Sequence, residues 1–334
     1  MRALALSLLP CALVACDRNG AEHTAGSAAP PAGSAVAAAD PWQAKPTPRD
    51  PNALPTIAER HARAEKICPT VTPYFFEVTK NGKTSHLLGT RHIGVPFAKM
   101  PPIVHAALHS AKLAIFEISP DDKGGFDAPP EPLRDELGSA DWTHFTELVG
   151  SDTAGTLVTA TPESAVLEML IEYEDVTAIL DKEIQIDALG SNIATGGLET
   201  SDFQDHVLAK MLDLRQLKAT IETTKDRAEI DSDGAKDLRE YCAGTEKSPG
   251  MDDEARGKMK KAGYTDAELD QQDDTLVYSR NRDWIPKLDK LFAQGDVFVA
   301  VGADHLIGDR GVIALLAKAG YATKRLTPPA GSAN

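Results

Sequence analysis

The sequence predicts an α/β (or α+β) protein with a central mixed sheet, flanking helices and a helical middle region. Three observations predict this class. Near both ends of the folded part, short apolar runs typical of strands alternate with the apolar spacing of helices. Between these ends, helical spacing dominates. The chain has 334 residues and is 42% hydrophobic, which suffices for a globular core.

The first 15 residues are expected to form a signal peptide rather than part of the fold. They combine Arg2 with an apolar run that is too short to span a bilayer, and the run ends in "LVAC" at Cys16. This ending resembles a bacterial lipobox, which implies cleavage before Cys16 and lipidation of that cysteine. A plain secretory leader is the alternative. We therefore expect a cell-envelope protein that is lipid-anchored to a bacterial membrane and faces the periplasm or the cell surface.

Residues 16–60 are expected to form a disordered tether, because Ala, Pro, Gly and Ser dominate and few residues are large. The folded domain is predicted at residues 65–328. Two cysteines, Cys68 and Cys242, remain outside the leader and the lipidation site. In an exported protein such a pair suggests one disulfide, and two buried free thiols are the alternative.

The net charge of the chain limits the classes of partner that are expected. The formal net charge is −15, and an acidic surface repels phosphate backbones, so no nucleic-acid partner is expected. Charged residues are densest at about residues 226–273. We expect this stretch to form an exposed, acidic helical insertion with short helices.

The first half of the domain begins with a hairpin. Two strand-like runs, "PYFFEVTK" and "KTSHLLGT", flank Asn81-Gly82, which is the strongest short hairpin signal because both turn residues need positive φ. A helix is expected in "PPIVHAALHSAK", where proline opens the pattern. The next apolar run, "LAIFEIS", predicts a buried strand with Glu117 near its end.

The rest of the domain alternates similarly. Helices are expected in "PESAVLEMLIEYE" and "DVTAILDKEIQIDALG". A strand end at "GGLET" is expected to lead into one long helix from "SDFQ" to about residue 226, with Ser201 or Asp202 as its N-cap. The last elements are a helix in "DTLVYSRNRDWIPKLDKLFAQ", a central strand in "DVFVAVGADH", a helix in "GVIALLAKAGY" and a strand in "ATKRL".

Two of these strands end in the same pattern, Gly-x-x-His. Glycine lets the backbone turn sharply at a strand end, so His92 and His305 are placed just beyond the carboxyl ends of their strands. Ligands bind at this edge of open α/β sheets, and the histidines converge there if their strands are neighbours. Glu117 is either a metal ligand or general base beside them or the partner of an arginine. Two imidazoles and one carboxylate form a recurrent divalent-metal site.

These motifs together resemble the TraB/PrgY/GumN family, which includes the TIKI metalloproteases. The resemblance runs from about Cys68 to Leu326 and is closest to bacterial GumN-like lipoproteins. It rests on "LLGT-x-H" after the hairpin, the "FE" strand, "GLET" with Glu199 and Gln204, "RN-x-x-W" with Arg280, Asn281 and Trp284, and the final "VAVGADHLIGDRGVIALLAKAGY".

The resemblance implies a fold like that of erythromycin esterases and ChaN-type proteins. It also implies a divalent-metal hydrolase in which His92, Glu117 and His305 are essential. Asp304 departs from many relatives, which have a small residue there; it is expected to face solvent rather than to orient the neighbouring imidazole. Trp284 is expected in the core, whereas Gln204 is expected to be exposed unless it faces the sheet.

The leading functional hypothesis is metal-assisted hydrolysis. A divalent ion (Mn, Co or Zn), held by the two histidines and Glu117, would lower the pKa of a bound water. Glu117 or Glu199 would accept the proton, and Arg280 or Asn281 would stabilise the oxyanion. Structural roles are the alternative. Glu199 would then be a carboxylate that faces a helix dipole, Arg280 would form a surface salt bridge and Asn281 would be a hydrogen-bonded brace.

The substrate would be a peptide, as in TIKI relatives, or a small ester. A non-catalytic lipoprotein that binds and sequesters a peptide is the alternative function, since PrgY-type relatives dampen a secreted peptide signal.

Overall fold

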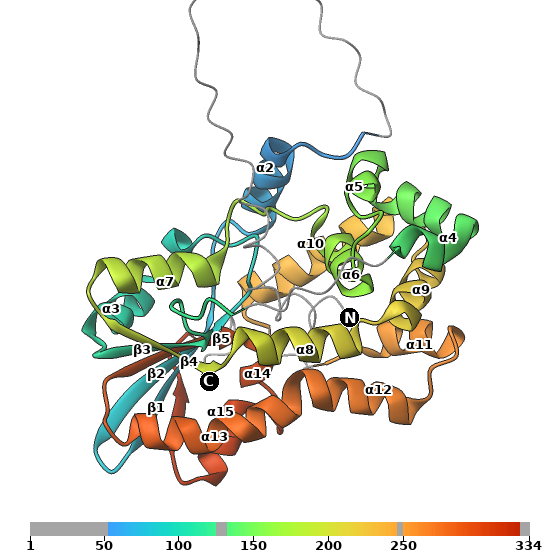
Figure 1. The fold of residues 1–334 in the computed structure, drawn as a ribbon. Coiled ribbons are helices and arrows are strands. Elements are labelled where there is room, and N and C mark those ends of the chain that lie inside the picture. Colours follow the sequence, from blue (N-terminus) through green and yellow to red (C-terminus); the bar gives the residue numbers. More distant parts are fainter. Residues whose placement is uncertain (1–52, 125–131, 246–249, 328–334) are drawn as a thin grey trace, which may run out of the picture.

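The computed structural model describes residues 53–124, 132–245 and 250–327. The predicted signal peptide, the lipidation site and most of the predicted tether lie outside the described residues. Six strands form one mixed sheet in the order β4-β3-β5-β2-β1-β6, with helices on both faces (Figure 1). The predicted class is therefore confirmed.

The antiparallel part of the sheet follows the sequence closely. Strands β1 (Tyr74–Lys80) and β2 (Lys83–Thr90) form the predicted hairpin. Its turn residues, Asn81 and Gly82, have φ values of 52° and 71°, which are the positive values that this turn requires. The last strand, β6 (Ala322–Arg325), pairs antiparallel with β1 at the edge of the sheet.

The other strands run parallel to β2. Strand β5 (Val297–Gly302) lies between β2 and β3 (Leu113–Ile118), and β4 (Ala194–Glu199) lies beyond β3. Every residue of β5 is buried, as expected for a central parallel strand. Because β2, β5, β3 and β4 are parallel, their carboxyl ends meet at one edge of the sheet.

Helices make up most of the remaining described chain. They are α2 (Ile57–Ile67), η3 (Phe97–Lys99), α3 (Pro102–Ser110), α4 (Leu133–Val149), α5 (Ser151–Thr156), α6 (Pro162–Ile171), α7 (Leu180–Gly190), α8 (Ser201–Met211), α9 (Leu214–Thr223), α10 (Arg227–Ala243), α11 (Asp253–Lys261), α12 (Asp266–Asp273), the π-helical turn η4 (Asp274–Tyr278), α13 (Ser279–Phe292), α14 (Ala303–Leu306) and α15 (Val312–Lys318). None of the described helices combines the length and the apolar character that crossing a membrane would need.

Three helix predictions are corrected. The long helix expected after β4 is two helices, because Asp213 accepts a hydrogen bond from the backbone of Gln216 and so caps a new helix, α9. The N-cap of α8 is Thr200, which is extended and accepts from Phe203, and not Ser201 or Asp202. Helix α7 starts at Leu180 rather than near residue 175, because the preceding residue forms an isolated β-bridge instead of a helical turn.

The region of residues 226–273 contains helices α10, α11 and α12. Helix α10 has 17 residues and is not short, contrary to expectation. It buries Ile230, Leu238 and Tyr241, so this part of the acidic stretch packs into the domain. Helix α2 begins within the segment assigned to the tether, where Thr56 and Glu59 form a capping box.

The disulfide expected between Cys68 and Cys242 is present, so the alternative of two free thiols is excluded. It joins the end of α2 to α10, across a Cα–Cα distance of 5.7 Å and a sequence separation of 174 residues. Lys99 Nζ donates a hydrogen bond to the carbonyl oxygen of Cys68, which adds a polar contact at the same end of α2.

The apolar interior consists of two main clusters. One surrounds the sheet and includes side chains of α3 and α7 on one face and of α13 and α15 on the other. The second lies among α4, α6, α8 and α9. Leu88 and Trp284 belong to the first cluster, whereas Ile93 and Val277 belong to the second. The carboxyl edge of the sheet therefore lies at the boundary between the two cores, a common location for binding sites.

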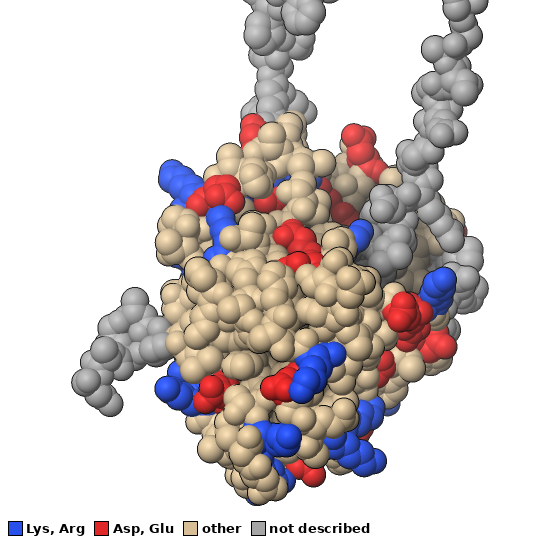
Figure 2. Space-filling view, turned by 90° about the vertical axis from the view of Figure 1, so that its left-hand side faces the viewer, with Lys and Arg blue, Asp and Glu red and all other residues tan. Residues whose placement is uncertain are grey.

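The surface is not uniformly charged. Figure 2 shows the side of α3 and α7, where the centre of the face carries neither lysine and arginine nor aspartate and glutamate. Ile103 of α3 and Ile186 and Leu189 of α7 are exposed apolar residues of these helices.

Candidate active site

The two Gly-x-x-His motifs lie side by side. Thr90 at the end of β2 is in register with Gly302 at the end of β5, and the histidines follow these positions. His92 and His305 are 1% and 0% exposed, and Glu117 in the neighbouring β3 is 3% exposed. The charge of His92 contributes to lowering the pKa of His305, as expected for two imidazoles in one site. The two histidines thus follow neighbouring parallel strands, which is the arrangement that the predicted convergence requires.

The first motif glycine permits this close approach. A Cβ atom on Gly89 would lie 2.9 Å from both the Cα atom of Ala303 and the Cβ atom of Tyr74. Ala303 belongs to the second motif, so the absence of a side chain at Gly89 lets the two motif backbones touch. The second motif glycine has a different role: the backbone N–H of Gly302 donates to Glu117 Oε1 at 2.7 Å.

Replacing Gly89 by alanine is expected to destabilise the protein by roughly 1–3 kcal/mol, because backbone must move to admit the methyl group. The measurement is urea unfolding followed by circular dichroism. Gly257→Ala in α11 is the control, since no heavy atom lies within 4 Å of a Cβ there and alanine favours helix. Equal stabilities of the two variants would contradict the close-contact explanation.

His92 is held through its Nδ1 atom. Asp181, at the start of α7, places a carboxylate oxygen 2.5 Å from this nitrogen and accepts from Thr90 Oγ1 at 2.8 Å with its other oxygen. A carboxylate only accepts, so Nδ1 of His92 is the protonated ring nitrogen. We did not identify Asp181 from the sequence, because it lies in an ordinary helical pattern 89 residues from its partner.

His305 is held in the same way by an amide. Its Nδ1 atom lies 2.7 Å from Oδ1 of Asn281 in α13, and its ring lies 4.4 Å from the ring of Trp284. Burial, together with the positive charges of Arg280 and His92, lowers the pKa of His305 well below its ordinary value. The imidazole is therefore neutral near physiological pH.

Glu117 is the centre of a buried ionic cluster. Its Oε2 accepts from Arg280 Nη2 at 2.8 Å and from Gln204 Nε2 at 3.1 Å, while Gly302 binds Oε1. Burial raises the pKa of Glu117, and the charge of Arg280 only partly opposes this effect. The arginine partner that the sequence left as an alternative is thus present.

Glu199, at the end of β4, completes the cluster. It pairs with Arg280, whose Nε donates at 3.1 Å, and it accepts from Gln204 and from Trp284 Nε1 at 3.3 Å each. The third nitrogen of Arg280, Nη1, donates to the carbonyl oxygen of Leu276 in the π-helical turn. Such turns often occur at functional sites. One guanidinium therefore balances two buried carboxylates.

Several sequence expectations are corrected here. Arg280 is 1% exposed, so its ion pairs are not on the surface, whereas Asn281 is hydrogen-bonded on both sides, as in the alternative of a hydrogen-bonded brace. Gln204 is fully buried and faces the site, and Trp284 is in the core, as expected, but also contacts both Glu199 and His305. Asp304 is 5% exposed and does not face solvent. These residues are buried near the boundary between the two apolar clusters. Their burial depends on tertiary packing, which the local sequence does not reveal.

The residues fit a metal ion only in part. In residues 53–124, 132–245 and 250–327, no group of three or more histidine, cysteine, aspartate or glutamate side chains is arranged to hold one. In addition, Glu117 is already engaged by three donors, namely Gln204, Arg280 and the backbone of Gly302. However, His305 Nε2 is buried without a hydrogen bond and lies 3.9 Å from Glu117 Oε1. Two atoms bound to one ion at ~2.1 Å each can be up to ~4.2 Å apart, so this pair is compatible with shared ligation.

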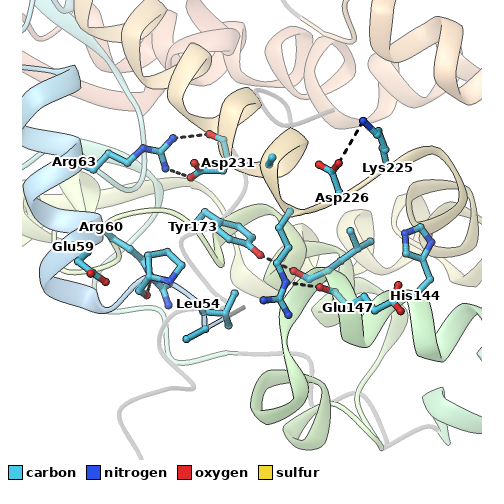
Figure 3. Close-up of a pocket in the computed structure, with 15 residues that line it drawn as sticks. Leu54, Glu59, Arg60, Arg63, His144, Glu147, Tyr173, Lys225, Asp226 and Asp231 are labelled. Carbon is cyan, nitrogen blue, oxygen red and sulfur yellow. Dashed lines mark hydrogen bonds and ion pairs between the residues drawn. The ribbon is translucent and has the colours of Figure 1, made fainter. Parts of the chain in front are cut away.

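A separate cleft does not include these residues. It has a volume of about 1050 Å³ and lies between α2, α4 and α10 (Figure 3). Its charged side chains pair largely with one another or with backbone, for example Arg63 with Asp231 and Lys225 with Asp226 at 3.6 Å. No predicted site residue lines this cleft. The candidate site therefore remains at the carboxyl edge of the sheet, apart from this cleft.

The fold and the site together define an α/β protein with a buried histidine–carboxylate centre at the carboxyl ends of parallel strands. The model of the TraB/PrgY/gumN family matches residues 74–325, which extend from the first residue of β1 to the last residue of β6. The chain belongs to this family. Comparison with curated proteins and with solved structures gives no match.

Proposed function

We propose that this protein is a divalent-metal-dependent hydrolase. The observation that carries the proposal is the pair of buried imidazoles on neighbouring parallel strands, each held through Nδ1 by an acceptor. This is how proteins orient metal-binding histidines, because the acceptor sets the tautomer whose lone pair is on Nε2. Family membership supports the same assignment, as the motifs that carry the histidines lie within the matched residues.

In this proposal His92 and His305 hold the ion, with Glu117 as the third ligand or as the base beside it. Mn, Co or Zn would acidify a bound water and polarise the scissile carbonyl. The raised pKa of Glu117 suits a residue that takes up a proton more readily than an ordinary glutamate does. Arg280 holds Glu117 and Glu199 in place and balances their charge.

The oxyanion role expected for Arg280 or Asn281 has little geometric support. Arg280 donates to two carboxylates and one carbonyl, and Asn281 donates to the carbonyl oxygen of Arg310 at 3.2 Å. Glu199 remains a candidate proton acceptor, although its carboxylate is engaged by Arg280, Gln204 and Trp284. The proposal therefore assigns the chemistry to Glu117 and the histidines first.

The preferred substrate is a peptide, and a small ester is the alternative. We further propose that the enzyme is anchored by lipid on Cys16 and acts in the cell envelope. Both statements rest on sequence and family resemblance. A peptide-binding protein without turnover is the second candidate function, and the engagement of Glu117 by three donors favours it.

The decisive experiment is His305→Ala with metal analysis after loading with Mn, Co or Zn. We expect stoichiometric metal in the wild type and its loss in the variant, together with loss of peptide cleavage and an unchanged circular dichroism spectrum. Affinity should fall by more than the ~10–100-fold that loss of a partner of a metal-bound imidazole costs.

His109→Ala is the matched control, because His109 is exposed and pairs with Asp187 away from the site. Unchanged metal content in His305→Ala would refute the assignment of this ligand. A wild type that holds no metal and cleaves no peptide, but binds one, would establish the second candidate function instead.

A further inference from the structure

Asn281 connects His305 to the loop that follows it. Its Oδ1 lies 2.7 Å from His305 Nδ1, and its Nδ2 donates to the backbone carbonyl of Arg310 at 3.2 Å. Both Asn281 and His305 are 0% exposed, so water does not compete for these contacts. The amide therefore has two defined partners, one on each side.

The carbonyl of Arg310 determines which way the amide faces. A carbonyl oxygen only accepts hydrogen bonds, so the NH₂ group of Asn281 must point toward it. The flipped amide would place two oxygens against each other and lose this hydrogen bond. Oδ1 must then face His305, and since Oδ1 also only accepts, the hydrogen between them is on Nδ1 of the imidazole.

The side chain of Arg310 has contacts of its own. Its guanidinium stacks 3.5 Å from the ring centroid of Tyr278 and forms an ion pair with Asp274, and both residues belong to the π-helical turn η4. The residue that bears the orienting carbonyl thus contacts η4, which leads directly into α13, the helix of Asn281.

The other ring nitrogen of His305 has no such partner. Nε2 is buried and makes no hydrogen bond, and the nearest carboxylate oxygen, on Glu117, is 3.9 Å away. A hydrogen on Nε2 would be a buried donor without an acceptor, which is unfavourable. Both ends of the ring therefore favour the same tautomer.

We propose that Asn281 is a positioning residue that holds His305 in the Nδ1–H tautomer, which leaves the lone pair on Nε2, 3.9 Å from Glu117 Oε1. The proposal deepens the proposed function, on which its relevance to metal binding rests. It replaces the oxyanion role for this residue by a role that acts through His305. The tautomer itself does not depend on whether a metal binds.

The test is ¹⁵N NMR of the histidine rings in metal-free protein at alkaline pH, where the imidazole is neutral. In the wild type, we expect Nδ1 of His305 to carry the hydrogen and Nε2 to have the shift of an unprotonated nitrogen. Asn281→Leu should shift the tautomer population toward Nε2–H. Asn281→Asp keeps an acceptor at this position and should retain the wild-type tautomer.

Gln216→Leu is the matched control, because Gln216 is also a fully buried amide but lies in a separate network with Met259 and Gln272. It should leave the spectrum of His305 unchanged. In a metal titration with Zn²⁺ or Mn²⁺, Asn281→Leu should bind roughly 10–100-fold more weakly than this control.

A wild-type His305 that carries its hydrogen on Nε2 would overturn the proposal, even if Asn281→Leu does not fold. An unchanged tautomer in folded Asn281→Leu would overturn it as well. A wild type with the expected tautomer that binds no metal would support the positioning role and refute the proposed metal-dependent function, so the two failures are distinguishable.

Discussion

Replacing Arg280 by leucine is expected to lower the free energy of unfolding by about 3–5 kcal/mol at neutral pH, because it removes the cation from a buried ionic cluster. Arg280 pairs with both Glu117 and Glu199, and the side chains of all three are at most 4% exposed. Without the guanidinium, two carboxylates remain close together away from water. The measurement is urea unfolding followed by circular dichroism.

The loss should depend on pH in a defined direction. Burial raises the pKa of Glu117 in the folded protein, and removal of Arg280 must raise it further because the arginine charge lowers it. A carboxyl group with a raised folded pKa destabilises the protein fully at pH above that pKa. The penalty disappears as the pH falls below the unfolded value, because both states are then protonated. The stability difference between Arg280→Leu and wild type should therefore shrink under acidic conditions.

Arg282→Leu is the matched control. Arg282 lies on the same helix and pairs with Asp274, but its side chain is 53% exposed. Exposed pairs contribute little, so we expect a loss below about 1 kcal/mol. If the two variants lose similar stability, or if the loss at Arg280 grows under acid, the buried cluster does not act as described.

Removing the disulfide by Cys68→Ser and Cys242→Ser is expected to cost about 3–5 kcal/mol of unfolding free energy. The bond closes a loop of 174 residues, and loops of this length lose much of their entropy when they are cross-linked in the unfolded chain. Helix α2 should be affected most. It buries only Ala64 fully, and its other contacts include ion pairs of Arg60 and Arg63.

Hydrogen exchange is the appropriate measurement, combined with urea unfolding. Amides of α2 should exchange faster in the double variant, whereas those of central strand β5 should report only the global loss. Wild-type protein treated with reductant is the control and should show the same midpoint as the variant. A variant as stable as the oxidised wild type would show that the cross-link does not stabilise the fold.

Local signals in the sequence predicted much of the fold. The Asn81-Gly82 turn, the period of two in the strands and the helical spacing of α3, α6 and α15 act over a few residues, so they can be recognised from the sequence alone. Errors arose where neighbouring signals competed. Asp213 divides a continuous helical pattern by capping a new helix, and Thr200 caps α8 although Ser201 and Asp202 are also good caps.

The sequence identifies most residues of the candidate site but few of the contacts between them. The Gly-x-x-His motifs, Glu117, Glu199 and the Arg280-Asn281 pair could be identified from the sequence, and the family match covers all of them. Apart from the arginine partner of Glu117, which the sequence left as an alternative, the partners of these residues were not predictable. Asp181 was missed because nothing near it in the sequence marks it, and for Asn281 the sequence left an oxyanion role and a hydrogen-bonded brace open without identifying His305 as the partner.

The sequence by itself determined the α/β class, the hairpin, the pair of histidines that follow glycine-ended strands, and membership in the family. Only the tertiary structure decided that one arginine balances two glutamates and that each histidine has its own acceptor. The physical reason is the separation along the sequence between the residues that interact. Turn and helix signals act between residues a few positions apart, whereas Arg280 and Glu117 are 163 residues apart and meet only because helix α13 packs against the sheet that contains β3.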